Sequence, residues 1–165
     1  MFWDSSALVP LLVSELRSAE VAQLLDDDHG PVTWWASTVE CASALHRRHR
    51  ESGLTRTELE TALRQLSALS PALTYILPVE EVRTRAASLL ALHALRAADA
   101  LQLAAALTWT EGLPKGDRFV CLDRRLREAA HLQGFTVVPG DELPMMAHDA
   151  PRKPRRRKSS QPATR

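Results

Sequence analysis

Four acidic residues of this 165-residue chain stand in surroundings that should be buried in a folded protein. Asp4 directly follows a short apolar stretch, and Asp123 follows another. Glu40 lies among small residues, and Asp99 interrupts an Ala- and Leu-rich run. An ionised carboxylate is costly to bury unless it is paired with a base or bound to a metal ion. We expect no basic residue one helical turn from Glu40 or Asp99 to neutralise it. A cation shared by the four acids is therefore the economical explanation.

Each acid also has a purely structural interpretation. Asp4 and Asp123 precede predicted helices, and Asp is a favoured N-cap residue. Asp99 would cap its own helix if that helix began later in the chain, and Glu40 would be solvated if its side of the helix faced water. Taken singly, capping explains Asp4 or Asp123 as well as a site does. Only the four acids together favour a shared site.

Hydrophobic patterning predicts strands that alternate with helices. The expected strands cover residues 1–5, 32–35, 74–79, 119–122 and 135–138. The expected helices cover residues 5–13, 18–25, 38–50, 55–71, 81–95, 97–109 and 124–132. The strands are short and continuously apolar, which is typical of strands that are buried on both faces. The pattern predicts an α/β fold with a parallel sheet covered by helices on both faces.

The ends of two strands bring two of the acids together in such a sheet. Ligands of open α/β sheets bind beyond the carboxyl ends of the strands, where the strand order reverses. In a 3-2-1-4-5 order this point lies between the first and fourth strands. Asp4 ends the first strand and Asp123 ends the fourth. Small residues at positions 37, 44, 98 and 106 would let the helices that carry Glu40 and Asp99 approach the same crevice.

Composition and charge narrow the class of protein. Hydrophobic residues make up 45% of the chain, and every long apolar stretch is interrupted by polar residues, so we expect no membrane span. Two isolated cysteines and no evident signal peptide favour a cytoplasmic protein. Residues 151–165 carry seven of the 21 basic residues and no acid, which leaves 14 bases against 20 acids, or a net charge of −6, in residues 1–150. We expect residues 144–165 to be a disordered basic tail that anchors RNA or only aids solubility.

The four acidic segments resemble a known family when they are taken in order. The segments are Asp4 to Val9, the residues around Glu40, Ala98 to Ala104, and Cys121 to Leu126. Together they look like the acidic motifs of the PIN-domain family, specifically the VapC-type toxins of bacterial toxin–antitoxin pairs. The resemblance covers about residues 1–143, and Cys121 stands where the family often has Thr or Ser.

The resemblance implies a fold, an activity and partners. The fold is a three-layer α/β/α sandwich with a five-stranded parallel sheet in the order 3-2-1-4-5. The activity is RNA cleavage by an endoribonuclease that depends on Mg²⁺ or Mn²⁺. The expected partners are the RNA substrate, a small cognate antitoxin that inhibits the enzyme, and a second copy of the chain in a homodimer.

The ligand types and the resemblance together assign roles to the acids. Asp4 and Asp99 are the expected primary metal ligands, and Glu40 would bind directly or through water. Asp123 would act through water or hold a second metal ion. Ser6 would donate a hydrogen bond to Asp4 or contact a phosphate oxygen. Because water would be the nucleophile, we expect products with 5′-phosphate and 3′-hydroxyl ends.

Four arginines are candidate RNA contacts: Arg47, Arg48, Arg124 and Arg125. Those at 47 and 48 follow Glu40 by two to three helical turns, and those at 124 and 125 directly follow Asp123. A solvated helix end or an antitoxin contact explains the first pair equally well, and surface salt bridges explain the second.

Two other functions compete with this interpretation. A haloacid-dehalogenase-like phosphatase also carries acids at strand ends, but it requires Asp-x-Asp, and Ser6 occupies the position of the second Asp. A PIN-like module that binds RNA or protein without catalysis is the other alternative. The presence of all four acids disfavours it.

Overall fold

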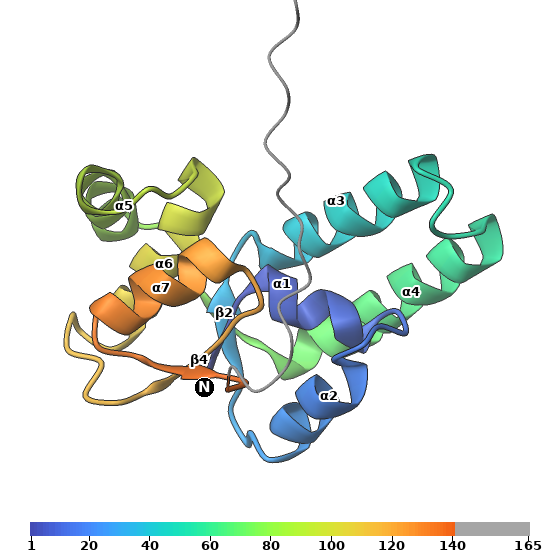
Figure 1. Cartoon of the computed structure of the whole chain (residues 1–165), viewed down its shortest axis with the longest axis horizontal. Coiled ribbons are helices and arrows are strands. Elements are labelled where there is room, and N and C mark those ends of the chain that lie inside the picture. Colours follow the sequence, from blue (N-terminus) through green and yellow to red (C-terminus); the bar gives the residue numbers. More distant parts are fainter. Residues whose placement is uncertain (141–165) are drawn as a thin grey trace, which may run out of the picture.

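Five short strands form one parallel sheet in the computed structural model, which describes residues 1–140 (Figure 1). They are β1 (Phe2–Trp3), β2 (Val32–Trp34), β3 (Thr74–Ile76), β4 (Arg118–Val120) and β5 (Thr136–Val138). Their order is β3-β2-β1-β4-β5, and every neighbouring pair is parallel. The predicted order 3-2-1-4-5 is confirmed. The order reverses between β1 and β4, so the crevice beyond their carboxyl ends is the expected ligand position.

Successive side chains of the central strands point to two separate apolar cores, as the two-residue repeat of a strand requires. Phe2 and Phe119 belong to one core, and Trp3 and Val120 belong to the other. The first core is covered by α5 (Glu80–Leu92), α6 (Ala97–Trp109) and α7 (Arg124–Leu132). The second is covered by α1 (Ser5–Leu8), the 3-10 helix η1 (Val9–Leu11), α2 (Ser18–Asp26), α3 (Ser37–Arg50) and α4 (Arg56–Leu69). The predicted three-layer α/β/α arrangement is confirmed, with the two helix groups on opposite sides of the sheet in Figure 1.

Helices α3 and α4 form a hairpin whose closed end projects from the rest of the molecule in Figure 1. Thr55 and Glu58 form the predicted capping box at the start of α4: the Glu58 N–H donates to Thr55 Oγ1 at 3.3 Å, and the Thr55 N–H donates to Glu58 Oε2 at 2.8 Å. These contacts satisfy backbone donors that have no partner within the helix. A short 3-10 helix, η2 (Ser70–Ala72), follows α4 and leads into β3.

Several predicted boundaries are wrong where proline or a bend interrupts an element. Residues 5–13 do not form one helix, because Pro10 has no N–H to continue the α-helical hydrogen bonds, and η1 replaces the last turn. The strand predicted to end at Val79 ends at Ile76, close to Pro78. The helix predicted to reach Leu95 ends at Leu92, because the chain bends by 119° between α5 and α6.

The prediction that all strands are buried on both faces is also wrong for the edges of the sheet. β1 and β2 are buried throughout. In β3 and β5, the first residue is exposed and the other two are only partly buried. An edge strand has a neighbouring strand on one side only, so its apolar composition does not by itself indicate full burial.

Within residues 1–140 no single helix is long and apolar enough to cross a membrane, and α5 and α6 pass such a test only as a bent pair. The predicted basic tail, residues 144–165, lies outside the described residues.

Candidate active site

Asp4 lies directly beyond the carboxyl end of β1 and is only 3% exposed. Its Oδ2 accepts hydrogen bonds from the backbone N–H of Ser6 at 2.9 Å and from the Ser6 hydroxyl. Burial raises the pKa of Asp4 from 3.8 to about 6; the Ser6 hydrogen bonds oppose this rise and the charge of Glu40 adds to it. No basic side chain of residues 1–140 forms an ion pair with Asp4. Asp4 is therefore a buried acid without a counter-charge in the described part of the chain.

Ser6 connects Asp4 to the end of β4. Its Oγ accepts hydrogen bonds from the backbone N–H groups of Leu122 at 2.9 Å and Asp123 at 3.3 Å while its proton goes to Asp4. The hydrogen bond that we predicted between Ser6 and Asp4 is therefore present. With its lone pairs and its proton used in this way, the Ser6 hydroxyl positions the two strand ends, and its contact with a phosphate stays a prediction.

Cys121 is fully buried next to Asp4. Its Sγ lies 3.6 Å from Asp4 Oδ2 and 3.6 Å from the Ser6 hydroxyl oxygen. Burial raises the pKa of the Cys121 thiol, and the charge of Asp4 raises it further. The thiol stays protonated and donates a weak hydrogen bond to the carboxylate.

Glu40 lies in the first turn of α3, with its charge close enough to Asp4 to raise the pKa of that residue. Both of its hydrogen bonds fall on the same oxygen, Oε2. The Ser5 hydroxyl donates to it at 2.7 Å and the Gln102 side-chain amide at 2.9 Å. Sequence reasoning did not identify Ser5 or Gln102. The available signal for Gln102 was one polar residue in the otherwise apolar run of α6.

Asp99 lies in the first turn of α6, and its Oδ2 accepts a hydrogen bond from the Arg96 backbone N–H at 3.2 Å. Partial burial raises the pKa of Asp99; the Arg96 hydrogen bond lowers it, Asp123 raises it, and the charges of Arg96 and Arg125 lower it. The expectation that no base lies one turn from Asp99 is wrong, because Arg96 precedes it by three residues. The two positive charges offset part of the cost of ionising Asp99.

Asp123 is exposed and is the N-cap residue of α7, where its Oδ1 accepts a hydrogen bond from the Leu126 N–H at 2.9 Å. Asp4 is likewise the N-cap residue of α1. The prediction that these two acids cap helices is therefore confirmed. Capping uses one carboxylate oxygen in each residue, and it does not exclude a ligand on the other.

The structure brings the four acids together as two pairs. Asp4 interacts with Glu40, and Asp99 interacts with Asp123. Within residues 1–140, no three His, Cys, Asp or Glu side chains converge as a group that could hold a metal ion. Asp99 Oδ2 accepts from the Arg96 N–H, and Asp123 Oδ1 accepts from the Leu126 N–H of α7. The chemistry of the donors nevertheless fits a hard divalent cation, because all four ligands offer carboxylate oxygens and Asp4, the most buried one, has no basic partner among the residues that the structure describes.

The candidate RNA contacts differ in their surroundings. Arg48 forms an ion pair with Glu15, and Arg47 is exposed in the last turn of α3, about 10 Å along the helix from Glu40 at 1.5 Å per residue. Arg124 and Arg125 are exposed in the first turn of α7, and the charge of Arg125 reaches Asp99. The charge of Arg125 lowers the pKa of Asp99, which favours Arg125 among these residues as a phosphate contact.

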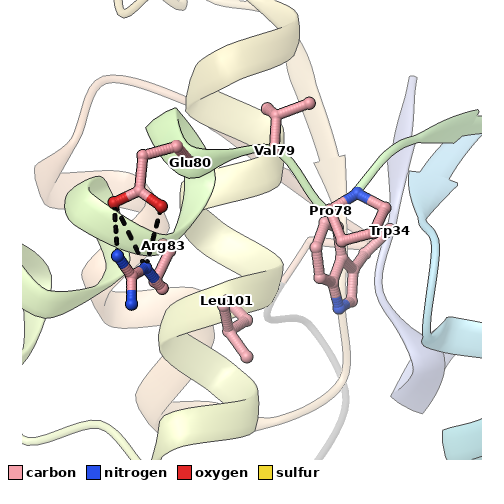
Figure 2. Close-up of a pocket in the computed structure, with 6 residues that line it drawn as sticks. All are labelled: Trp34, Pro78, Val79, Glu80, Arg83 and Leu101. Carbon is pink, nitrogen blue, oxygen red and sulfur yellow. Dashed lines mark hydrogen bonds and ion pairs between the residues drawn. The ribbon is translucent and has the colours of Figure 1, made fainter.

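A separate cavity of about 320 Å³ lies beside the end of β3. Figure 2 shows its lining, which consists of Trp34, Pro78, Val79, Glu80, Arg83 and Leu101. The only acid in this lining, Glu80, forms an ion pair with Arg83 at 2.6 Å. None of the four candidate ligands lines the cavity, so it is distinct from the acidic site.

The parallel sheet and its strand order agree with the comparisons with known proteins. The PIN domain family matches residues 1–132, and the chain belongs to this family. Its relatives include ribonuclease VapC45 and ribonuclease VapC49 from two strains of Mycobacterium tuberculosis. Each is 34% identical to this chain over 139 residues, which cover 84% of this chain and 94% of the relative.

Proposed function

We propose that this chain is a ribonuclease toxin of the VapC type that cleaves RNA internally with the help of Mg²⁺ or Mn²⁺. The observation that carries the proposal is the buried carboxylate of Asp4, which lies beside Glu40 at the switch point of the sheet and has no basic partner among residues 1–140. A buried carboxylate beside a second acid is costly unless a cation neutralises it. Membership of the PIN domain family and the similarity to two ribonucleases support the same conclusion.

The four acids would hold the divalent cation, with Asp4 buried, Glu40 and Asp99 partly buried, and Asp123 exposed. A bound Mg²⁺ or Mn²⁺ ion would ease deprotonation of water and stabilise the leaving 3′ oxygen. Ser6 and Cys121 keep the Asp4 carboxylate in place through hydrogen bonds to Oδ2. Arg125, whose charge reaches Asp99, would attract the RNA phosphate to an otherwise negative site.

Cleavage of a mixed RNA pool, including tRNA, tests this proposal. Purified chain is incubated with Mg²⁺, with Mn²⁺ or with a chelator, and D4N and D99N preparations control for contaminating nucleases. We expect metal-dependent cutting by the wild type alone, with 5′-phosphate and 3′-hydroxyl product ends. D117N is a matched control, because Asp117 is exposed and lies before β4 rather than after it, and it should cut like the wild type.

A non-catalytic PIN-like module that binds RNA or protein is the second candidate. It is favoured by one observation, which is that no three candidate ligands converge within residues 1–140. The same experiment separates the two functions. Folded protein that binds RNA but does not cut it with either metal, and that binds no metal at millimolar concentrations, supports the non-catalytic module.

An antitoxin is the proposed protein partner of the acidic site. Because Asp4 and Glu40 lack basic partners within residues 1–140, a segment with Lys or Arg side chains could pair with them and displace the metal. A small protein encoded beside this chain should co-purify with it and suppress cutting. Full activity of the complex would contradict this role. The two buried free cysteines are compatible with the reducing cytoplasm in which such a pair would act.

A homodimer is the proposed assembly. Four large apolar side chains are strongly exposed near the ends of β2 and β3 and in the first turn of α3: Trp35 (53%), Val39 (66%), Leu77 (58%) and Val79 (49%). A backbone hydrogen bond of 3.1 Å from Trp35 to Ile76 joins the two strand ends there. We place the second copy on this surface because the surface exposes an apolar area that is unusual for a monomer. It also lies next to the acidic site, since Val39 directly precedes Glu40 in α3. The double variant V39E/L77E should sediment as a monomer. The control L113E changes a similarly exposed leucine elsewhere, and it should sediment with the mass of the wild-type dimer.

A further inference from the structure

Gln102 carries a polar side-chain amide in the middle of the largely apolar helix α6, and the residue is only 1% exposed. A buried amide is costly unless its donors and acceptor find partners. Its Nε2 donates to Glu40 Oε2 at 2.9 Å and to Ser37 Oγ at 3.0 Å. Both amide protons are therefore used, and one of them is used on a candidate metal ligand.

The contact with Ser37 continues as a buried chain of hydrogen bonds to β1. The Thr33 hydroxyl oxygen lies 2.8 Å from Ser37 Oγ and 2.7 Å from the carbonyl oxygen of Trp3. A hydroxyl has one proton, and the Trp3 carbonyl can only accept one. Thr33 therefore donates to Trp3, and the single proton of Ser37 is shared between Thr33 Oγ1 and Gln102 Oε1, which lies 3.3 Å from Ser37 Oγ. The chain ends on the backbone of the residue before Asp4, so it fixes Gln102 relative to that strand.

Gln102 leaves one oxygen of Glu40 unoccupied. Ser5 and Gln102 both donate to Oε2, and no hydrogen bond to Oε1 is formed within residues 1–140. An amide also donates without carrying a charge, so it orients the carboxylate and leaves its negative charge intact. A Lys or Arg at position 102 would instead neutralise Glu40. Orientation without neutralisation is the requirement for a residue that supports a metal ligand.

We propose that Gln102 is a positioning residue for the metal, which holds Oε2 of Glu40 so that Oε1 is presented to the cation. This inference rests on the proposed metal-dependent function. Gln102 follows Asp99 by three residues on α6. The amide consequently also ties the helix that carries Asp99 to the helix that carries Glu40, and it couples the two acid pairs of the site.

Direct measurement of Mn²⁺ binding to the whole chain, by calorimetry or by the electron spin resonance of free Mn²⁺, tests this role without relying on activity. The variant is Q102M, which keeps the size of the side chain and removes the amide. The expected result is Mn²⁺ affinity weaker by about 10- to 100-fold, the usual effect of losing a hydrogen-bond partner of a metal ligand. The matched control is T108V on the same helix, because Thr108 Oγ1 is buried without a hydrogen-bond partner in the described residues. It should bind Mn²⁺ like the wild type.

A double-variant cycle with E40A shows whether Gln102 acts through Glu40. If it does, Q102M weakens Mn²⁺ binding in the wild type but not in the E40A background. An equal loss in both backgrounds would mean a general structural effect and would overturn the inference. S37A, which keeps the amide but removes one of its anchors, gives a second measurement if Q102M does not fold. It should weaken Mn²⁺ binding less than Q102M and more than T108V, and wild-type affinity in S37A would count against the proposal.

The D4N variant separates this inference from the proposed function. Loss of Mn²⁺ binding in D4N with wild-type binding in Q102M would overturn the role of Gln102 alone. Absence of saturable Mn²⁺ binding in the wild type would overturn both.

Discussion

At the scale of single residues, Asp4 combines two roles that sequence reasoning treated as alternatives. It is the N-cap residue of α1, and it is a buried acid next to Glu40. The Ser6 N–H, which completes the cap, and the Ser6 hydroxyl both donate to the same carboxylate oxygen, Oδ2. Within residues 1–140 the other oxygen, Oδ1, accepts no hydrogen bond and remains for a cation. A capping acid at the end of a central parallel strand is therefore compatible with a metal ligand.

The pKa of Asp4 predicts how the metal-free protein responds to pH. In the folded protein the carboxyl stays neutral up to about pH 6, while in the unfolded chain it ionises above 3.8. Below 3.8 both states are protonated and Asp4 makes no difference. As the pH rises from 3.8 to 6 the unfolded state gains the advantage of ionisation, and above 6 the folded protein has lost about 3 kcal/mol of stability.

The D4N variant should remove this loss. We expect metal-free D4N to be more stable than the wild type near neutral pH by up to about 3 kcal/mol, and equal to it below pH 3.8. Urea denaturation with a chelator present measures the difference. D123N is the control, because Asp123 is also an N-cap residue but is exposed, and Asn caps a helix nearly as well as Asp. A D4N protein that is less stable than the wild type at neutral pH would contradict the assigned cause.

At the scale of elements, the sequence predicted several helix ends well, because a helix end depends on residues that are close together in the chain. The capping box of Thr55 and Glu58 marked the start of α4 correctly, and the predicted α6 boundaries match Ala97–Trp109. The sequence did not reveal that β3 and β5 would be half exposed at the sheet edges, because an apolar strand has the same composition at an edge as at the centre. Burial of a strand depends on its neighbours, and those come from distant parts of the chain.

Removal of the α4 cap should affect stability and not activity. T55A takes away the acceptor of the Glu58 N–H, so we expect a loss of about 1 kcal/mol in the free energy of unfolding. Thr61 lies on the same helix, where its hydroxyl donates to a carbonyl of the preceding turn and accepts from the exposed Arg64 side chain at 2.9 Å, so T61A should change stability much less. Urea denaturation compares the two variants. Equal losses, or loss of RNA cleavage in T55A at a temperature where it is folded, would argue against this assignment.

The positions of the candidate ligands were predictable to the level of the element but not of the carboxylate. Asp4 and Asp123 follow β1 and β4, as the strand order predicts. The sequence did not show that the Asp99 carboxylate accepts a hydrogen bond from Arg96, or that Gln102 reaches Glu40. Side-chain orientation depends on competing hydrogen bonds, and these form only when α3, α6 and β1 pack together.

At the scale of the whole molecule, charge is unevenly distributed along the chain. Residues 151–165 carry seven basic residues and no acid, and the remaining residues carry a net charge of −6. An acidic body repels RNA, so a basic segment would supply affinity that does not depend on sequence. We propose that residues 151–165 serve as this RNA anchor.

Truncation after Asp149 tests the anchor. With a chelator present to prevent cutting, the truncated chain should bind RNA more weakly at low salt, and its affinity should fall less steeply as salt increases. Replacement of the seven basic residues by Gln is the control for tail length and should reproduce the effect of truncation. Unchanged affinity at low salt would reject the anchor and leave the tail with a role in solubility.

The central claim is that the acids at the switch point hold a divalent metal ion. Crystals grown with Mn²⁺ test it most directly, because anomalous scattering locates the ion without reference to activity. We predict a peak in the crevice beyond β1 and β4, coordinated by Asp4 and by Oε1 of Glu40, with Asp99 turned from Arg96 toward the ion. A protein that cuts RNA with Mn²⁺ while the ion lies elsewhere, or while Asp4 keeps no metal contact, would contradict the account.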